Sequence, residues 1–287
     1  MKKNKKILIV GGTGFIGYHL AKKCLKKGWV THSLSSKKPI KKRIIKKVKY
    51  LICDISKKRN LKNELKDNYN FVVNLGGYVD HTNIKKTYKS HFLGCKNLSE
   101  IFINRKINSF IQIGSSSEYG KNKSPQNEKR ICKPTSIYGR SKLLATKHLI
   151  NLYNKKKFPC TVLRLYQVYG PFQDYNRFIP FVIKSCINKV NFPCSHGNQL
   201  RDFTYVSDVV DAIIKSLINK KESNGKIINI GSGKVQKIKN VIEKIRKLVR
   251  GGRPEYGAIK LRKDEMINIS PNLKLSNDLL NLKAKTS

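Results

Sequence analysis

The sequence has few acidic residues and no long apolar run, and both shortages restrict what the protein can be. Only 17 Asp and Glu residues accompany 61 Lys and Arg residues. No stretch approaches the roughly 18 apolar residues of a membrane span. The run that follows the basic start "MKKNKKILIV" is interrupted by "GGTG", so it is too short for a signal-peptide core. These features predict a cytoplasmic protein without a membrane segment.

The sequence also lacks the spacings that build disulfide and metal sites. Its seven cysteines contain no CxxC motif and fall mostly inside apolar stretches, and its six histidines never stand at metal-ligand spacing. We therefore expect reduced, buried thiols, no structural disulfide and no metal. Each histidine is interpreted as a packing or surface residue.

The net charge of +44 comes almost entirely from lysine spread along the whole chain. Proteins that bind nucleic acids more often concentrate their charge and interleave aromatic residues with it. A solvated basic surface that favours small anions is therefore the preferred interpretation, and we expect no nucleic acid partner. Binding of nucleic acid through the lysines is the alternative, and it predicts retention of DNA that depends steeply on salt.

Short aliphatic runs such as "ILIV", "FVVNL" and "FIQIG" alternate with longer amphipathic segments. Because this is the pattern of parallel strands joined by helices, it predicts an α/β fold with a Rossmann-type doubly wound parallel sheet. The weakly periodic tail from about residue 251 predicts a small C-terminal lobe. Residues 1–170 would form the main domain, with further sheet elements from about 200–235, and residues 171–200 and 236–287 would form mainly the lobe.

A glycine-rich turn stands between the first expected strand and helix. In "ILIVGGTGFIGYHL", Gly11, Gly14 and Gly17 form G-x-x-G-x-x-G, with Phe15 and Ile16 between the last two glycines. Glycines permit a tight turn, and the helix N-terminus offers N–H groups to a pyrophosphate. The context predicts that the main domain binds NAD(P).

The end of the second expected strand distinguishes NAD from NADP. Dinucleotide folds that bind NAD place an acidic residue there for the ribose 2′-hydroxyl. This chain has Ser35, followed by Ser36, Lys37 and Lys38, which can meet a 2′-phosphate. NADP is therefore favoured over NAD.

A tyrosine and a lysine four residues apart predict acid/base chemistry. Tyr138 and Lys142 in "SIYGRSK" would share one face of a helix. An ammonium near the phenol would lower the pKa of Tyr138 from its ordinary value of about 10. The segment "GSSSEYG", residues 114–120, adds hydroxyls at the end of an apolar strand, where ligands bind in α/β proteins.

With these motifs the chain resembles the extended branch of the short-chain dehydrogenase/reductase superfamily, the nucleotide-sugar epimerases and dehydratases. The motifs that carry the resemblance run over nearly the whole chain: "GGTGFIG", "CDI", "NLGG", "GSSSEYG", "PTSIYGRSK", "LRLYQVYGP" and "RDFTYVSDVVDAI". The resemblance implies an enzyme that acts on a nucleotide-diphosphate sugar, and a homodimer.

The resemblance also implies roles for individual residues. Tyr138 would be the acid/base group, Lys142 would bind the nicotinamide ribose, and Ser115 would be the catalytic hydroxyl, with Ser116 as the alternative. The cofactor would further contact Asp54, Ile55, Leu75, Gly76 and Gly77. The substrate would contact Ser115, Gln167, Arg201 and Arg262. For Arg201 the alternative is an ion pair with Asp202 or Asp208.

Some positions depart from the family pattern. Gln167 stands where many relatives have asparagine, and His91 replaces the asparagine that usually precedes a helix glycine. The usual closing "LGWxP" segment is absent, because the chain ends "LLNLKAKTS". These departures leave the sugar specificity open.

Three reactions remain possible at this stage. A C4 epimerase, of the kind found in surface-polysaccharide pathways, is favoured, and an NADPH-dependent reductase of a 4-keto-6-deoxy sugar is the alternative. A 4,6-dehydratase needs an acidic residue shortly after the catalytic hydroxyl, and Glu118 falls one residue late if Ser115 has that role. A non-catalytic dinucleotide sensor would typically lose the Tyr and Lys pair, which this chain retains.

Overall fold

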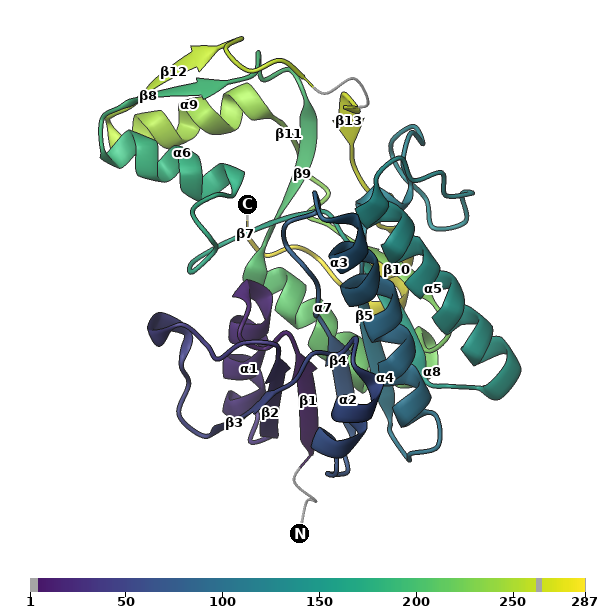
Figure 1. Cartoon of the computed structure of the whole chain (residues 1–287). Helices are drawn as coiled ribbons and strands as arrows, with labels where there is room; N and C mark the ends of the chain where they lie inside the picture. Colours follow the sequence, from purple (N-terminus) through teal and green to yellow (C-terminus); the bar gives the residue numbers. More distant parts are fainter. Residues whose placement is uncertain (1–4, 262–264, 287) are drawn as a thin grey trace.

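Aliphatic runs form a parallel sheet of seven strands within the residues described by the computed structural model, 5–261 and 265–286 (Figure 1). In six of the seven strands most residues are buried, because helices cover both faces of the sheet. In spatial order the strands are β10 (Ile227–Ile230), β6 (Cys160–Leu165), β5 (Ser109–Ser115), β4 (Phe71–Asn74), β1 (Lys6–Val10), β2 (Val30–Ser35) and β3 (Val48–Ile52). The order reverses direction between β1 and β4, where ligands bind in doubly wound sheets.

Two layers of helices enclose this sheet. One core lies under α1 (Phe15–Lys26) and α7 (Val206–Ile218), which also contact each other. The other lies under α2 (Lys58–Glu64), α4 (Gly94–Phe102) and α5 (Ile137–Lys156). The predicted Rossmann-type doubly wound fold is confirmed.

Short elements connect the layers. They are η1 (Lys41–Arg43), α3 (Ile84–Tyr88), the π-helical turn η2 (Lys89–Leu93), η3 (Ser116–Glu118) and α8 (Lys220–Ser223). The turn η2 continues directly into α4, and α3 packs on both η2 and α5. The segment after β4 is thereby held beside the start of α5.

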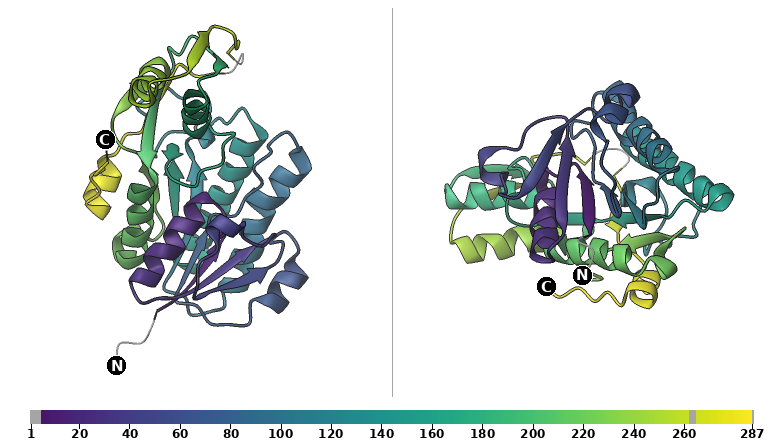
Figure 2. Two further views of the ribbon diagram at one scale, coloured as in Figure 1. Left: turned by 90° about the vertical axis from the view of Figure 1, so that its left-hand side faces the viewer. Right: turned by 90° about the horizontal axis from the view of Figure 1, so that it is seen from below.

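A smaller lobe stands beyond the carboxyl ends of the strands (Figures 1 and 2). It contains α6 (Phe178–Ile187), α9 (Ile238–Val249) and the paired strands β8 (Asn191–Cys194) and β12 (Arg253–Tyr256), around a core that includes Val182, Phe192 and Ile242. A second small sheet joins β7 (Gln167–Tyr169), β9 (Leu200–Tyr205), β11 (Val235–Lys237) and β13 (Asn268–Ile269). The last helix, α10 (Lys274–Leu280), returns to the main domain, where Leu280 joins the core under α1 and α7.

A buried ion pair supports the end of β5. Glu118 is fully buried and Arg164 is 2% exposed; the Arg164 Nε donates to Glu118 Oε2 at 2.9 Å. The same carboxylate accepts hydrogen bonds from the Ser115 backbone N–H at 2.9 Å and from the Thr146 hydroxyl at 2.8 Å. Since a buried charge is tolerated only when it is paired and hydrogen-bonded, these contacts depend on one another.

We predict that Arg164→Met lowers the free energy of unfolding by about 3–5 kcal/mol, because it leaves the Glu118 carboxylate buried without its cation. The double variant Arg164→Met, Glu118→Gln should recover part of that loss. Urea unfolding followed by circular dichroism measures both. The control is Lys58→Met, which breaks an exposed pair with Glu100 and should cost less than about 1 kcal/mol. A single Arg164 variant as stable as this control would contradict the prediction.

Candidate active site

The glycine-rich turn has the geometry that its sequence predicts. Gly11 has φ +79°, and its N–H donates to the Leu34 carbonyl at 2.7 Å, which joins the turn to β2. A Cβ on Gly17 would stand 2.3 Å from the Gly11 carbonyl oxygen, so only glycine lets α1 start this close to the turn. The turn therefore brings the α1 N-terminus against the ends of β1 and β2.

The start of α1 suits an anionic group. Gly14 is its N-cap residue and supplies no side-chain cap, and the first turn, which begins with Phe15 and Ile16, holds no acidic residue. The N–H groups and the positive end of the helix dipole thus stay available to a diphosphate. The residues present fit a dinucleotide at this turn.

The residues expected near the adenine ribose lie along one edge of this turn. Ser35 ends β2 and is buried, and its hydroxyl accepts a hydrogen bond from the Thr13 N–H at 3.4 Å. Ser36 and Lys37 follow it and are exposed. Asp54 is exposed and accepts from the Ser56 N–H at 2.9 Å.

The segment after β4 lies directly against the glycine-rich turn. A Cβ on Gly11 would stand 3.0 Å from both Leu75 and the Gly76 nitrogen, and the Leu75 N–H donates to the Val10 carbonyl at 2.9 Å. The buried Ile55 side chain approaches Gly76 from the other side. The structure thus brings Gly11, Ile55, Leu75 and Gly76 together, with Gly77 next along the chain.

Ser115 and Tyr138 meet at the end of β5. Ser115 is the last residue of β5 and is 8% exposed, and its side chain is hydrogen-bonded to that of Tyr138, on the first turn of α5. The N-cap of α5 is Ser136, whose side chain accepts from the Gly139 N–H at 3.1 Å and fixes where the helix begins. Ser116 lies on η3, one residue beyond the strand.

The pKa of Tyr138 differs in direction from the sequence-based prediction. Burial raises the pKa of Tyr138, while its hydrogen bond with Ser115 and the nearby Arg177 act in the opposite direction. The Lys142 ammonium instead donates to the Ile113 carbonyl at 2.7 Å, and its Nζ is 5.9 Å from the centre of the phenol ring. The expectation that Lys142 lowers the pKa of Tyr138 is thus wrong in this structure, because desolvation of the phenol outweighs the charges around it.

Burial also acts on Lys142 itself. The side chain is almost completely enclosed, and desolvation lowers the pKa of Lys142 to about 8, although Glu118 acts to raise it. The Lys142 ammonium lies between β5, whose Ile113 carbonyl accepts its hydrogen bond, and the Tyr138 ring on α5.

Two histidines that the sequence analysis treated as packing residues contact Tyr138. The His81 ring is stacked on the phenol with centroids 4.1 Å apart and an angle of 12° between the planes. The His91 ring meets the phenol edge-on at 5.0 Å and 79°. The only signal in the sequence is the unusual His91 itself, since nothing local relates residues 81 and 138.

Arg43 is another buried residue that the sequence did not reveal, because it ends the lysine-rich stretch "KKPIKKR". It is 6% exposed, and its guanidinium donates to the Phe172 carbonyl and to Asp174, each at 2.6 Å. A longer contact of 3.4 Å reaches the Thr13 carbonyl. Arg43 thus joins the glycine-rich turn to the segment that leads into the lobe.

The predicted substrate residues open onto a pocket of about 470 Å³ between the small sheet and the lobe. Gln167 and Arg201 both line it, together with aromatic residues such as Phe178 and Phe203, which stack at 5.9 Å. Arg201 is 4% exposed and forms an ion pair with Glu265 rather than with Asp202 or Asp208. Arg262 lies outside the described residues.

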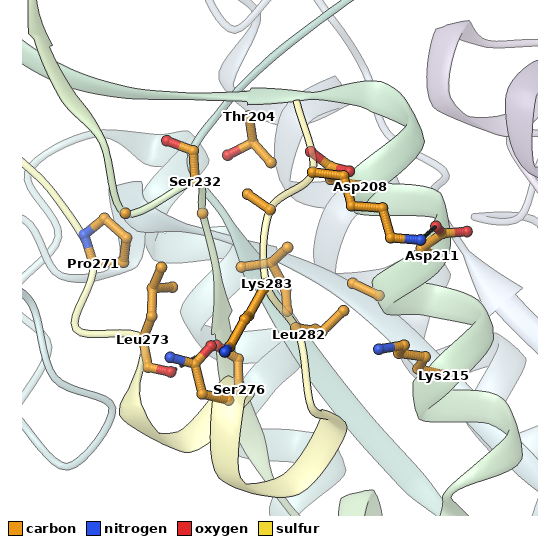
Figure 3. A pocket seen from close by; sticks show the side chains of 17 residues that line it. Thr204, Asp208, Asp211, Lys215, Ser232, Pro271, Leu273, Ser276, Leu282 and Lys283 are labelled. Atoms are coloured by element: carbon orange, nitrogen blue, oxygen red, sulfur yellow. Dashed lines mark hydrogen bonds and ion pairs between the residues drawn. The ribbon is translucent and has the colours of Figure 1, made fainter. Parts of the chain in front are cut away.

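A second pocket, of about 480 Å³, lies between α7, the loop 231–233 and the C-terminal segment (Figure 3). Thr204, Asp208, Lys215 and Ser232 are among its lining residues. None of the described residues that the sequence predicts for catalysis, cofactor or substrate belongs to it.

The described residues contain no group of three or more His, Cys, Asp or Glu side chains placed to hold a metal ion. Within the same residues, no helix combines the length and apolar character of a membrane span. All seven cysteines are free, and six of them are buried.

Comparisons with known proteins show the family to which the chain belongs. The family described as "NAD dependent epimerase/dehydratase family" matches residues 7–231. CDP-abequose synthase of Salmonella muenchen is 31% identical over 278 residues, which cover 94% of this chain and 89% of that protein. Protein CapI of Staphylococcus aureus is 31% identical over 290 residues, which cover 88% of this chain and 86% of that protein.

Solved structures show the same fold. The epimerase Mth375 of Methanothermobacter thermautotrophicus superimposes with a TM-score of 0.92 at 23% identity, over 99% of this chain and 88% of that one. UDP-glucose 4-epimerase of Thermotoga maritima gives a TM-score of 0.91 at 22% identity, over 98% and 94% of the two chains. With the matched family model and these relatives, the chain belongs to the NAD-dependent epimerase/dehydratase family of nucleotide-sugar enzymes.

Proposed function

We propose that the protein transfers hydride at C4 of a nucleotide-diphosphate sugar without eliminating water, and that C4 epimerisation is its reaction. The observation that carries this proposal is the meeting of Ser115 and Tyr138 at the end of β5, beside Lys142. Relatives of the family that are named for their reaction include a putative UDP-glucose 4-epimerase of Methanocaldococcus jannaschii, 28% identical over 95% of this chain.

In the proposed reaction Tyr138 exchanges a proton with the oxygen on C4, and the Ser115 hydroxyl orients that oxygen through a second hydrogen bond. A bound nicotinamide supplies the hydride acceptor and donor. Lys142 binds the nicotinamide ribose and places positive charge beside the phenol. In epimerisation the phenolate form of Tyr138 accepts the proton of the C4 hydroxyl when C4 is oxidised, and the phenol returns it to the 4-keto oxygen when C4 is reduced from the other face. Burial raises the pKa of Tyr138 and so favours the second of these proton transfers.

The position of Glu118 supports a reaction without elimination. A dehydratase needs a free acidic group beside the catalytic hydroxyl, whereas the Glu118 carboxylate is fully buried and bonded to Ser115, Thr146 and Arg164. A buried carboxylate that already accepts three hydrogen bonds from protein donors is poorly placed to move a proton of the substrate.

The substrate would enter through the pocket lined by Gln167 and Arg201. We propose that the diphosphate of the nucleotide sugar displaces Glu265 from Arg201, because a guanidinium binds a phosphate with two parallel hydrogen bonds. We further propose a role in surface-polysaccharide sugar synthesis, a cytoplasmic location and a homodimer.

A second candidate is an NADPH-dependent reductase of a 4-keto-6-deoxy sugar. The observation that favours it is Ser35, which stands at the end of β2 where a carboxylate would select NAD, beside the exposed Ser36 and Lys37. The similarity to CDP-abequose synthase over 94% of this chain is compatible with such a reaction.

One experiment distinguishes C4 epimerisation from reduction of a 4-keto sugar. Purified protein is incubated with UDP-, GDP-, CDP- and dTDP-sugars and their 4-keto-6-deoxy forms, with and without NADPH. Isomerisation without consumption of NADPH supports the epimerase, and net consumption supports the reductase. Tyr138→Phe should lower turnover about 10²–10⁴-fold while binding of the cofactor is kept, because only the proton donor is lost. Turnover of this variant at the wild-type rate would refute the proposed function.

We predict that the protein binds NADPH more tightly than NADH, as measured by quenching of its single tryptophan or by calorimetry. Ser35→Asp should reverse the preference, because a carboxylate repels the 2′-phosphate. Lys37→Gln should weaken NADPH alone. The matched control is Lys221→Gln, an exposed lysine on α8, which removes the same charge far from the turn. Tighter binding of NADH by the wild-type protein would show that the NADP preference is wrong.

A further inference from the structure

Two imidazole rings enclose the catalytic phenol on adjacent sides. His81 covers one face of Tyr138 in a nearly parallel stack at 4.1 Å, and His91 closes an edge at 5.0 Å. The two imidazoles are themselves 5.8 Å apart at 69°. Aromatic rings prefer offset-stacked and edge-to-face arrangements at such separations, so all three contacts are favourable.

Local hydrogen bonds stabilise the turn that carries His81. The Asp80 carboxylate accepts hydrogen bonds from the Thr82 N–H at 3.1 Å and the Thr82 hydroxyl at 2.6 Å. Asn83 then caps α3 by accepting from the Lys86 N–H at 2.9 Å. A backbone hydrogen bond at Tyr78 also reaches the His81 ring. The imidazole is therefore presented to Tyr138 by two successive local motifs.

The His91 ring is held by contacts with Gly77 and Tyr78, which shortly precede His81 in the chain. It is 5% exposed, and its Nε2–H donates to the Tyr78 carbonyl at 3.2 Å. A Cβ on Gly77 would stand 2.2 Å from the His91 ring, so glycine at this position admits the imidazole. Tyr78 thus contacts both histidines, so one piece of backbone supports the two rings.

Burial, together with the cations around the stack, lowers the pKa of both imidazoles. Burial lowers the pKa of His81, and Arg177 and Lys142 act in the same direction, while Asp80 opposes them. Burial, with Lys142, lowers the pKa of His91 to about 2. The titratable and charged groups that face this cluster are Asp80, Glu118, Lys142 and Arg177. The stack is thus a contact between uncharged rings.

We propose that His81 is a positioning residue, whose ring holds the Tyr138 phenol flat against the turn so that its hydroxyl stays hydrogen-bonded to Ser115. Rotation about the Cα–Cβ bond of a tyrosine carries its hydroxyl through a wide arc. The imidazole on its face removes much of that freedom before substrate arrives. This inference rests on the proposed role of Tyr138 as the acid/base group.

The test compares His81→Ala with His81→Phe. His81→Ala removes the stacked ring and should lower kcat by about tenfold with KM within about twofold, because misplacement of a catalytic group affects the chemical step more than binding. His81→Phe keeps a flat ring without nitrogen atoms and should restore kcat to within about threefold of the wild type.

The pH profile gives a readout that a loss of folding would not produce. Removing the His81 ring lets water reach the phenol and should lower the pKa of Tyr138. The limb of the kcat–pH profile that reports Tyr138 should therefore move to lower pH in His81→Ala and stay in place in His81→Phe. Thermal unfolding of each variant checks the fold. If His81→Ala does not fold, His81→Leu, which has an apolar side chain without a flat ring, replaces it and should show the same loss of kcat.

The matched control is Lys85→Ala, which changes an exposed residue of α3 outside both motifs and should keep kcat near the wild-type value. A kcat within twofold of wild type in His81→Ala with an unmoved pH profile would overturn the inference. So would a His81→Phe variant as slow as His81→Ala, because the nitrogen atoms and not the stack would then matter. Wild-type turnover in Tyr138→Phe would instead refute the proposed function itself.

Discussion

The Glu118 carboxylate joins three elements beneath the active site. It accepts the Ser115 N–H at the end of β5, the Thr146 hydroxyl on α5 and the Arg164 guanidinium on β6. Thr146 lies one turn after Lys142 and two turns after Tyr138 on the same helix. The carboxylate therefore fixes the strand end that carries Ser115 relative to the helix that carries Tyr138 and Lys142. Arg164 balances its charge, so this arrangement does not require water in the core.

Desolvation is the second constraint that shapes the site. It raises the pKa of Tyr138 and lowers that of Lys142 to about 8, so the uncharged form of each group is favoured. Groups with such perturbed pKa values are typical of active sites, where acid/base work must proceed near neutrality. The many lysines of the surface contribute little to this effect, since water screens them. The buried cluster and not the net charge of +44 determines the chemistry.

The local sequence pattern was sufficient to predict those elements whose contacts join residues that are close together in the sequence. The glycine-rich turn, the parallel strands and the Tyr138 and Lys142 pair depend on short-range spacing, and the sequence predicted each of them. The sequence also placed Glu118 out of register for elimination, and its bonds to Arg164 and Thr146 are consistent with that interpretation.

The sequence could not supply contacts that depend on tertiary packing. His81 lies 57 residues before Tyr138, and only the joint placement of β4, α3 and α5 brings the rings together. Arg43 was hidden among lysines, and Arg201 pairs with Glu265, 64 residues away, instead of the nearby aspartates. The pKa of Tyr138 was predicted in the wrong direction, because a pattern of charges contains no information on how much water burial removes.

The most direct test of the account is the kinetic isotope effect with a nucleotide sugar that the protein turns over and that carries deuterium at a single ring carbon. Hydride transfer at C4 predicts a primary effect on single-turnover rates when the deuterium is at C4 and none when it is at C3. For a 4-keto substrate, deuterium on the reduced nicotinamide takes the place of the C4 label. An effect confined to the C3 label, or a C4 hydrogen that exchanges with solvent during turnover, would contradict hydride transfer at C4.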